Sequence, residues 1–379
     1  MNMAHQKPGS DQLIDLLARQ WTLSSAVKGA VFSCNSGAVA FDCSDGSVSV
    51  VTTKDPESAT RRMRRAADTG NQTIRPRKGK VAPVHNVTCP VPRSSLVVGY
   101  GKRNFLFGTA NGQLAMVTPQ GSATMLDTGA TGPVVAVAAI HGGPRLCYAM
   151  GRHVALCEDK GLKPSASLQM ASPVVAMAFS PDGTALAVAH ETGIAVLDVV
   201  GTPELRQEYP LDFAPQDICW SVNAHWIAAT LGSHGAALAN LQSHEIRRFK
   251  DFPIAVNSLS FSAVANAIAI SGAFRAAAWS LSDLRTNEET SKAALGSGHP
   301  GLVPVDSVSA CPTRNILAVG YSSGLLNLTQ IGSKEEMLLD RDTGTGISSL
   351  TWAGNGNFLA IGRTDGTAAL VDFPKGMFK

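Results

Sequence analysis

The sequence predicts an all-β fold, a closed β-propeller of four-stranded blades with a short N-terminal helix, and three observations support this prediction. A module of about 40 residues recurs along the chain, which is a period expected of propellers. Each copy reads as short strands separated by turn residues. The final copy lacks one strand, which the first residues of the chain can supply, so the ring can close.

The clearest copy of the module covers residues 173–200 and reads PVVAMAFSPDGTALAVAHETGIAVLDVV. Its first turn is Ser180-Pro181-Asp182-Gly183 and its second is Glu191-Thr192-Gly193. Pro and Asp favour turns, and Gly adopts positive φ at little cost, so both turns have a physical basis. The copy therefore predicts three strands joined by two hairpins.

Eight copies can be aligned, and most successive copies start 39 to 42 residues apart. They start at Val27, Ser94, Pro133, Pro173, Pro215, Ala255, Val305 and Gly346. The two longer intervals contain a polar tract at 52–85 and an extension near 285–304 that is rich in Ser, Gly and Pro. Eight blades are therefore favoured over seven.

A fourth and more polar strand follows the three clear ones, as at 204–209 and 245–249. The last copy, 346–373, lacks this strand, and residues 20–25 (QWTLSS) are expected to supply it. A closed ring removes the sheet edges that would otherwise invite aggregation. We therefore expect a tail and amphipathic helix at 1–19, then a propeller at 20–379 that a basic, flexible insertion interrupts at about 52–85.

Two segments carry a family resemblance. Gly298-His299 precedes the strand-like segment VDSVSACP, and AFSPDGTALAVAHETGIAVLDVV contains Leu197-Asp198 close to its end. They resemble the Gly-His element and the central body of the WD-repeat family, with Leu-Asp where that family has Trp-Asp. The resemblance covers nearly the whole chain and implies a propeller, although no Trp-Asp dipeptide occurs and most copies lack Gly-His.

The composition favours a globular, cytoplasmic protein. It is 44% hydrophobic and 16% charged, and the net charge of +3 is too small for a general nucleic-acid binder unless it is concentrated in one segment. The seven cysteines form no Cys-x-x-Cys pair, so we expect reduced thiols and no zinc cage. The sequence near the start has no apolar stretch long enough for a signal peptide or a membrane span.

Two kinds of motif resemble catalytic signatures. The Asp-Thr-Gly triplets at Asp127 and Asp342 match the aspartic-protease motif, but both precede the first strand of a copy, so the repeat explains them. The segment Gly320-Tyr321-Ser322-Ser323-Gly324 matches the nucleophile elbow, which requires a following helix, whereas LLNLTQI reads as a strand. We interpret the two triplets as polar loops between copies and the third segment as a hairpin turn.

Two pairs of possible metal ligands are spaced four residues apart, His153 with Cys157 and His85 with Cys89. On a strand this spacing places both side chains on one face. A pair alone does not make a metal site, which requires three or four ligands. We expect ordinary structural residues, with no metal and no cofactor.

Basic residues gather at 52–80, where nine basic side chains against three acidic ones give a net charge of +6 and leave −3 for the rest of the chain. The tract has almost no large apolar residues, so we expect a mobile loop or a partly helical arm. It contains no aromatic residue to stack on bases, which makes nucleic acid a less favoured partner. A solvated insertion without a partner has equal weight. The proposed partner-binding residues are Arg61, Arg62, Arg64, Arg65, Arg75, Arg77, Lys78 and Lys80.

Residues 10–21, SDQLIDLLARQW, predict an amphipathic helix with Ser10 or Asp11 as its N-cap. An isolated helix this short is marginal in water, so its apolar face must be covered. Packing against the propeller itself is slightly favoured over docking to a partner through Leu13, Ile14 and Leu17.

These observations favour a non-catalytic protein-interaction scaffold or assembly subunit of a larger intracellular complex, whose partner presents an acidic surface. The alternative is an adaptor that binds RNA or a membrane through the basic insertion. An enzyme or ligand-binding propeller is less favoured, because the loops around the expected central channel carry mostly Gly, Ser, Thr, Ala and Pro. We expect no small-molecule substrate.

Overall fold

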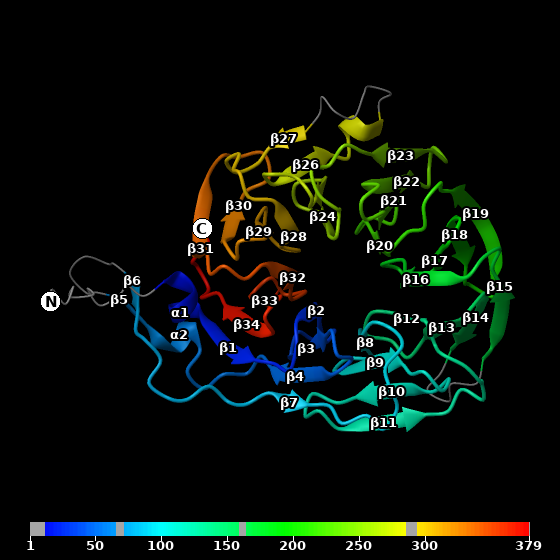
Figure 1. The fold of residues 1–379 in the computed structure, drawn as a ribbon, viewed down its shortest axis with the longest axis horizontal. Helices are drawn as coiled ribbons and strands as arrows, with labels where there is room; N and C mark the ends of the chain where they lie inside the picture. The colour runs from blue at the N-terminus through cyan, green and yellow to red at the C-terminus, as the bar shows by residue number, and fades with distance from the viewer. Residues whose placement is uncertain (1–11, 66–71, 159–163, 286–293, 379) are drawn as a thin grey trace, which may run out of the picture.

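Eight four-stranded antiparallel sheets stand around a ring in the computed structural model, which describes residues 12–65, 72–158, 164–285 and 294–378 (Figure 1). The first strand of each sheet contacts the first strand of a neighbouring sheet, so these strands line the centre of the ring. The predicted all-β propeller with eight blades is confirmed. The first strands begin within a few residues of the eight copy starts read from the sequence.

Blades 1 to 4 take their strands in chain order from the centre outward. Blade 1 consists of β2 (Val27–Phe32), β3 (Ala38–Cys43), β4 (Val48–Thr52) and β7 (His85–Asn86). Blade 2 consists of β8 (Val98–Tyr100), β9 (Asn104–Gly108), β10 (Leu114–Val117) and β11 (Ala123–Leu126). Blade 3 consists of β12 (Ala136–Ala139), β13 (Leu146–Met150), β14 (His153–Cys157) and β15 (Ala166–Gln169). Blade 4 consists of β16 (Val174–Phe179), β17 (Ala185–His190), β18 (Gly193–Asp198) and β19 (Glu204–Pro210).

Blades 5 to 7 continue in the same way. Blade 5 consists of β20 (Asp217–Trp220), β21 (Trp226–Thr230), β22 (Ala236–Asn240) and β23 (Ile246–Phe249). Blade 6 consists of β24 (Leu259–Ser262), β25 (Ala267–Ile270), β26 (Ala277–Ser280) and β27 (Ala294–Gly296), with the 3-10 turn η1 (Asp283–Arg285) after β26. Blade 7 consists of β28 (Val305–Ala310), β29 (Leu317–Tyr321), β30 (Leu326–Thr329) and β31 (Glu336–Asp340).

Blade 8 joins the two ends of the chain. Its inner strands are β32 (Ile347–Trp352), β33 (Phe358–Arg363) and β34 (Thr367–Asp372), and its outer strand is β1 (Ala18–Thr22). The register of β1 with β34 runs from Ala18↔Val371 to Thr22↔Thr367, and Figure 1 shows β1 in blue beside β34 in red. The predicted closure by the N-terminal segment is confirmed, and we call this pair of strands the closing seam.

The closing strand starts at Ala18, two residues before the predicted segment, and the helix before it is short. Helix α1 covers Leu13–Leu17, whereas the sequence predicts a helix over 10–21, of which residues 10 and 11 lie outside the described residues. Residues 18–22 pair with β34, and this ladder satisfies their backbone groups in place of helical bonds. The predicted boundary between residues 19 and 20 falls inside β1, so α1 leads directly into blade 8.

Small side chains and hydroxyl groups hold neighbouring blades together. Between blades 4 and 5, Ala187 and Ala189 pack in one buried cluster with Ile227, and the alanines allow the two sheets to approach closely. Between blades 6 and 7, the Ser258 hydroxyl donates to Val308 O at 2.9 Å and accepts from Val308 N at 3.1 Å. The inner ring is therefore fixed by packing together with hydrogen bonds that join one blade to the next.

The basic insertion leaves blade 1 between β4 and β7. It contains α2 (Ala59–Arg62), β5 (Met63–Arg65) and β6 (Gln72–Ile74), and β5 pairs with β6. A short helix therefore does occur in the predicted arm. Across the described residues, no helix has the length and apolar character that crossing a membrane requires.

The hairpin turn between β21 and β22 depends on a glycine. Gly235, between β21 and β22, has φ +89°, and a Cβ atom there would collide with Phe249 O, whereas Gly201 has φ +81° with open space around it. Left-handed strain costs about 1–3 kcal/mol, so Gly201→Ala should lower the free energy of unfolding by roughly that amount. Gly235→Ala should cost more, because the collision adds to the strain. Chemical denaturation of both variants measures the difference, and equal losses would contradict the turn geometry.

Candidate functional site

The basic insertion lies against α1 and the closing seam (Figure 1). Its described residues, 53–65 and 72–82, form what we call the docked insertion. Trp21 Nε1 on β1 donates to Ala82 O at 2.7 Å, and Ala59 N donates to Asp372 Oδ2, at the end of β34, at 3.2 Å. The docked insertion therefore contacts both strands of the closing seam.

Apolar packing supports these contacts. Ala59 is 1% exposed and belongs to the buried cluster that also contains Ile14 and Leu17 of α1 and Phe373. Ile74 of β6 packs against the same cluster. The insertion thus contributes side chains to a core that otherwise comes from α1 and blades 7 and 8.

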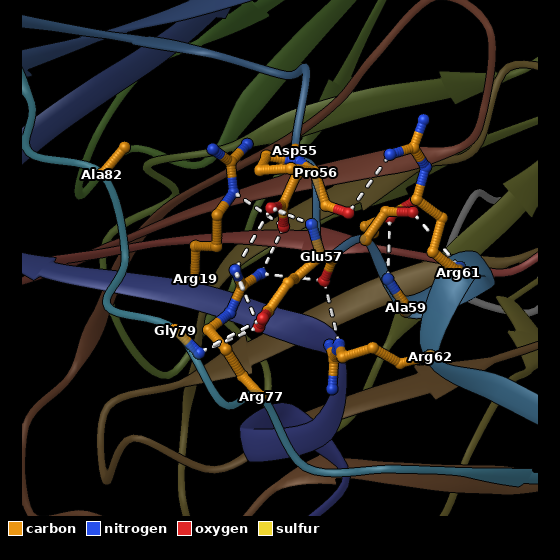
Figure 2. Close-up of polar contacts among 12 residues, drawn as sticks. Arg19, Asp55, Pro56, Glu57, Ala59, Arg61, Arg62, Arg77, Gly79 and Ala82 are labelled. Carbon is orange, nitrogen blue, oxygen red and sulfur yellow. Dashed lines mark hydrogen bonds and ion pairs between the residues drawn. The ribbon is translucent and has the colours of Figure 1, made fainter.

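Arg62 is the central hydrogen-bond donor of the docked insertion. Its guanidinium donates to Glu57 O at 2.9 Å, to Arg75 O at 2.6 Å and to Leu16 O at 2.5 Å. Figure 2 shows the Arg62 side chain between α1 and the chain around Glu57. Arg62 is buried, and this burial lowers its pKa from the ordinary value. One side chain therefore joins three separate segments through their carbonyl groups.

Asp55 is the main carboxylate acceptor of the docked insertion. Its carboxylate, 6% exposed, pairs with both terminal nitrogens of Arg77 and lies 3.7 Å from Arg19 Nε on β1 (Figure 2). It also accepts from Glu57 N at 2.9 Å. Burial alone would raise the pKa of Asp55, but the Arg77 hydrogen bonds, the Glu57 amide and the two arginine charges together hold the pKa below its ordinary value. Asp55 is therefore ionised within the folded protein at neutral pH.

Glu57 fixes the returning part of the insertion. Its carboxylate accepts from Lys78 N at 3.1 Å and from Gly79 N at 3.1 and 3.2 Å. These two amides lower the pKa of Glu57. Both described acidic residues of the docked insertion are thus used in internal contacts.

The structure separates the predicted basic residues into two groups. Arg62 and Arg77 are turned inward, and the side chain of Arg65 lies outside the described part of the structure. The others are exposed to solvent, and Lys54, which the prediction did not include, is exposed with them. The exposed group consists of Lys54, Arg61, Arg64, Arg75, Lys78 and Lys80.

The three predicted apolar residues of the N-terminal helix lie on the propeller. Ile14 and Leu17 are 3% and 2% exposed, and Leu13 packs against the same cluster from the edge. They cover blades 7 and 8, which is the packing that the sequence slightly favoured. Ile14 and Leu17 are therefore not accessible to a partner in this conformation. Of the three residues, only Leu13 is partly exposed, and its contact with a partner stays a prediction.

Sequence reasoning did not identify the inward contacts of Arg19, Asp55 and Asp372. A signal was present, because Asp55 and Glu57 are acidic residues within a basic tract, where internal pairing is expected. Nothing in the sequence indicated that Arg19 and Asp372, far apart along the chain, would meet the insertion.

The motifs that resemble catalytic signatures lie in loops and turns. Asp127 Oδ1 accepts from Gly129 N, and Asp342 Oδ1 accepts from Gly344 N, both at 3.0 Å, so the two triplets have the same geometry at equivalent positions in two blades. Gly324, at φ +95°, closes the hairpin between β29 and β30, where a nucleophile elbow would need a helix. The two triplets lie in the loops after β11 and β31, and the third segment is the hairpin turn between β29 and β30, as predicted.

The two pairs of possible metal ligands noted in the sequence differ in exposure within each pair or lie in separate surroundings. His153 is exposed at the start of β14 while Cys157 is buried at its end, and His85 is exposed on β7. The Cys89 Sγ lies 3.8 Å from Met125 Sδ. No group of three or more His, Cys, Asp or Glu side chains able to hold a metal ion occurs among the described residues.

A Ser-His-Glu arrangement occurs in blade 4, in which Ser172 and His190 are buried and the Glu208 side chain is 43% exposed. Ser172 Oγ lies 2.9 Å from His190 Nδ1, and His190 Nε2 lies 3.4 Å from Glu208 Oε1. Ser172 and His190 are 8% and 1% exposed, and Ser172 Oγ also accepts from Thr192 N. Burial lowers the pKa of His190, while the Glu208 charge opposes this shift. The hydroxyl is already committed to the turn before β18, so we interpret this group as structural.

The centre of the ring contains a cavity of about 370 Å³, which inner strands of blades 1, 2, 5, 6, 7 and 8 line. Several of its hydroxyl groups already bond to the next blade, such as Thr351 to Ala30 O at 2.9 Å and Ser348 to Val27 O at 2.6 Å. Its lining includes the charged residues Lys28, Asp42 and Asp217. This cavity offers less convergent chemistry than the docked insertion, which remains the best candidate site.

A buried and an exposed ion pair can be compared directly. Asp55→Asn should lower the free energy of unfolding by about 3 kcal/mol at neutral pH, because it removes the nearest counter-charge of Arg77 and leaves only the Glu57 carboxylate, 3.9 Å away, as its described ion-pair partner. In Asp212→Asn, which removes a pair with Arg248 from a 65% exposed carboxylate, the loss should stay below about 1 kcal/mol.

The contribution of Asp55 to stability also depends on pH. Because the pKa of Asp55 is lowered in the folded protein, this contribution is complete above pH 3.8 and disappears as the pH falls through the folded-state pKa. Denaturation at several pH values measures this, and equal losses for both variants would contradict the assignment.

The comparisons with known proteins agree with this geometry. The family model described as anaphase-promoting complex subunit 4 WD40 domain matches residues 308–378, which include most of blade 7 and the inner strands of blade 8. No curated protein matches the chain. The matched segment and the eight blades around the ring together support a relationship to the WD-repeat β-propeller family.

Proposed function

We propose that the protein is a non-catalytic scaffold, a subunit of a larger cytoplasmic complex, that holds a partner protein with an acidic surface at the docked insertion. WD-repeat propellers are in general platforms for protein interaction. The observation that carries the proposal is the sorting of charge: Asp55 and Glu57 are turned inward, while six cations face solvent on the same segment. Fixed cations attract and orient an acidic surface.

The ring offers a second, apolar contact surface for such a scaffold. Leu302, in the loop between blades 6 and 7, is 95% exposed, and Gly301 N beside it donates to the carbonyl of Phe274, which is 42% exposed. Phe213 stacks on His234 with ring centroids 3.5 Å apart, on loops of blades 4 and 5. Exposed large apolar side chains on a rigid rim are typical of interaction surfaces.

The subunit role has independent support from the family comparison. The matching family model is named for a subunit of the anaphase-promoting complex, that is, for a component of an assembly. We propose the same kind of role for this chain, without assigning it to that complex. The proposal of a cytoplasmic location follows the expectation of reduced thiols, and none of the seven cysteines is disulfide-bonded in the structure.

Replacing the outward cations tests the proposal without disturbing the inward contacts. A variant with serine at Arg61, Arg64, Arg75, Lys78 and Lys80 should lose its partner in affinity capture from the native source, and with it the salt dependence of binding. The matched control places serine at five exposed cations on other parts of the ring, for the same change in net charge. These control positions are Lys102, Arg103, Arg152, Arg206 and Lys334.

Retention of the partner by the first variant, with unchanged salt dependence, would exclude the insertion as the binding surface. Capture that nuclease abolishes, or binding to anionic vesicles that only the first variant loses, would favour the alternative adaptor function. Deleting the whole insertion is a poorer test, because it also removes Asp55, Arg62 and Arg77 from the closing seam.

A further inference from the structure

The docked insertion has two faces with different partners. Its inner face holds the two ends of the chain: Arg62 donates to Leu16 O just before β1, and Asp372 accepts from Ala59 N just after β34. Its outer face carries the exposed cations. Both faces belong to the same short segments. A movement of these segments away from the closing seam would therefore also change the positions of the outer cations.

Arg62 links the two faces mechanically. Its hydrogen bonds reach Glu57 O, just before α2, and Arg75 O, just after β6. The exposed cation Arg61 lies on α2, and the side chain of Arg75 is itself exposed. Its third bond reaches Leu16 O and thereby the closing seam. Docking on the seam and the spatial arrangement of the outer cations therefore depend on the same side chain.

The outer cations oppose docking when no anion is bound. Like charges confined to one small segment repel one another, and the repulsion weakens when the segment undocks and spreads. An anionic ligand removes this repulsion, and it binds better to cations that are already fixed in place than to a mobile segment. By thermodynamic linkage, a ligand that prefers the docked state must stabilise that state.

We propose that an acidic protein segment bound to the outer cations tightens the closure of the ring, with the docked insertion as the coupling element. This inference rests on the proposed function, since it takes the same acidic partner. It adds that binding and ring closure are coupled. The partner stabilises the pairing of β1 with β34, and weakening that pairing lowers the affinity for the partner, by the same factor in both directions. The rigidity of the scaffold then depends on whether its partner is bound.

The test uses a polyglutamate peptide as the acidic probe and hydrogen exchange of the β1 amides, Ala18–Thr22, as the measure of closure. Arg62→Lys keeps the charge but removes the planar donor that reaches three carbonyl groups. Arg103→Lys makes the same chemical change at an exposed arginine in the turn between β8 and β9, outside the docked insertion. The two variants differ in inward bonding and not in net charge.

We expect polyglutamate to slow exchange of the β1 amides in the unmodified protein, by at least about fivefold at saturation. Arg62→Lys should speed β1 exchange in the absence of peptide and weaken peptide binding by several-fold, whereas Arg103→Lys should leave both close to those of the unmodified protein. Amides of β17, far from the seam in blade 4, serve as the internal reference and should not respond.

Peptide binding that leaves β1 exchange unchanged in the unmodified protein would overturn the coupling while leaving the proposed function intact. Equal peptide affinities for the two variants would overturn it as well. Absence of saturable peptide binding to the unmodified protein would reject the acidic partner itself, and with it both proposals. Because the measurement on the unmodified protein needs no substitution, the inference stays testable even if Arg62→Lys fails to fold.

Discussion

The pairing of β1 with β34 is the interaction on which the rest of the structure depends. Each blade packs only on its two neighbours, so an open seam would leave blade 8 without its outer strand. The buried cluster between blades 8 and 1 contains Leu370 and Phe41 and includes Trp21 from β1 at its edge. In each of the other blades the paired strands come from one continuous stretch of chain, whereas β1 and β34 of blade 8 pair residues more than 300 positions apart, which carries a large entropic cost of closure.

The basic insertion is best understood from its position at this seam. Its inward polar groups make specific contacts with β1, β34 and α1, and its outward groups are exposed cations. The insertion leaves blade 1 between β4 and β7, and blade 1 is next to the closing blade. A partner that binds there contacts the part of the ring whose stability is least supported by chain connectivity.

The repeat made the fold predictable, and the departures from it were harder to predict. Turn residues and strand lengths recur in each copy, so blade number, strand starts and ring closure could be read from 173–200 and its relatives. The residue at which α1 ends could not be predicted from the sequence. Residues 18–21 are compatible with a helix, and they form a strand only because they pair with β34. The inward role of Arg62 could not be predicted either, because carbonyl acceptors such as Leu16 O leave no mark on the sequence.

Disulfide trapping of the seam tests ring closure most directly. Thr22 and Thr367 are paired in the register of β1 with β34, so Thr22→Cys combined with Thr367→Cys should cross-link under mild oxidation, because directly opposed strand residues bring their Cβ atoms close together. Gln20→Cys with Thr367→Cys, two residues out of register, should not. Peptide mapping by mass spectrometry distinguishes the new bond from any formed by the native cysteines. Cross-linking of the second pair in place of the first, or of neither, would contradict a ring closed by its two chain ends.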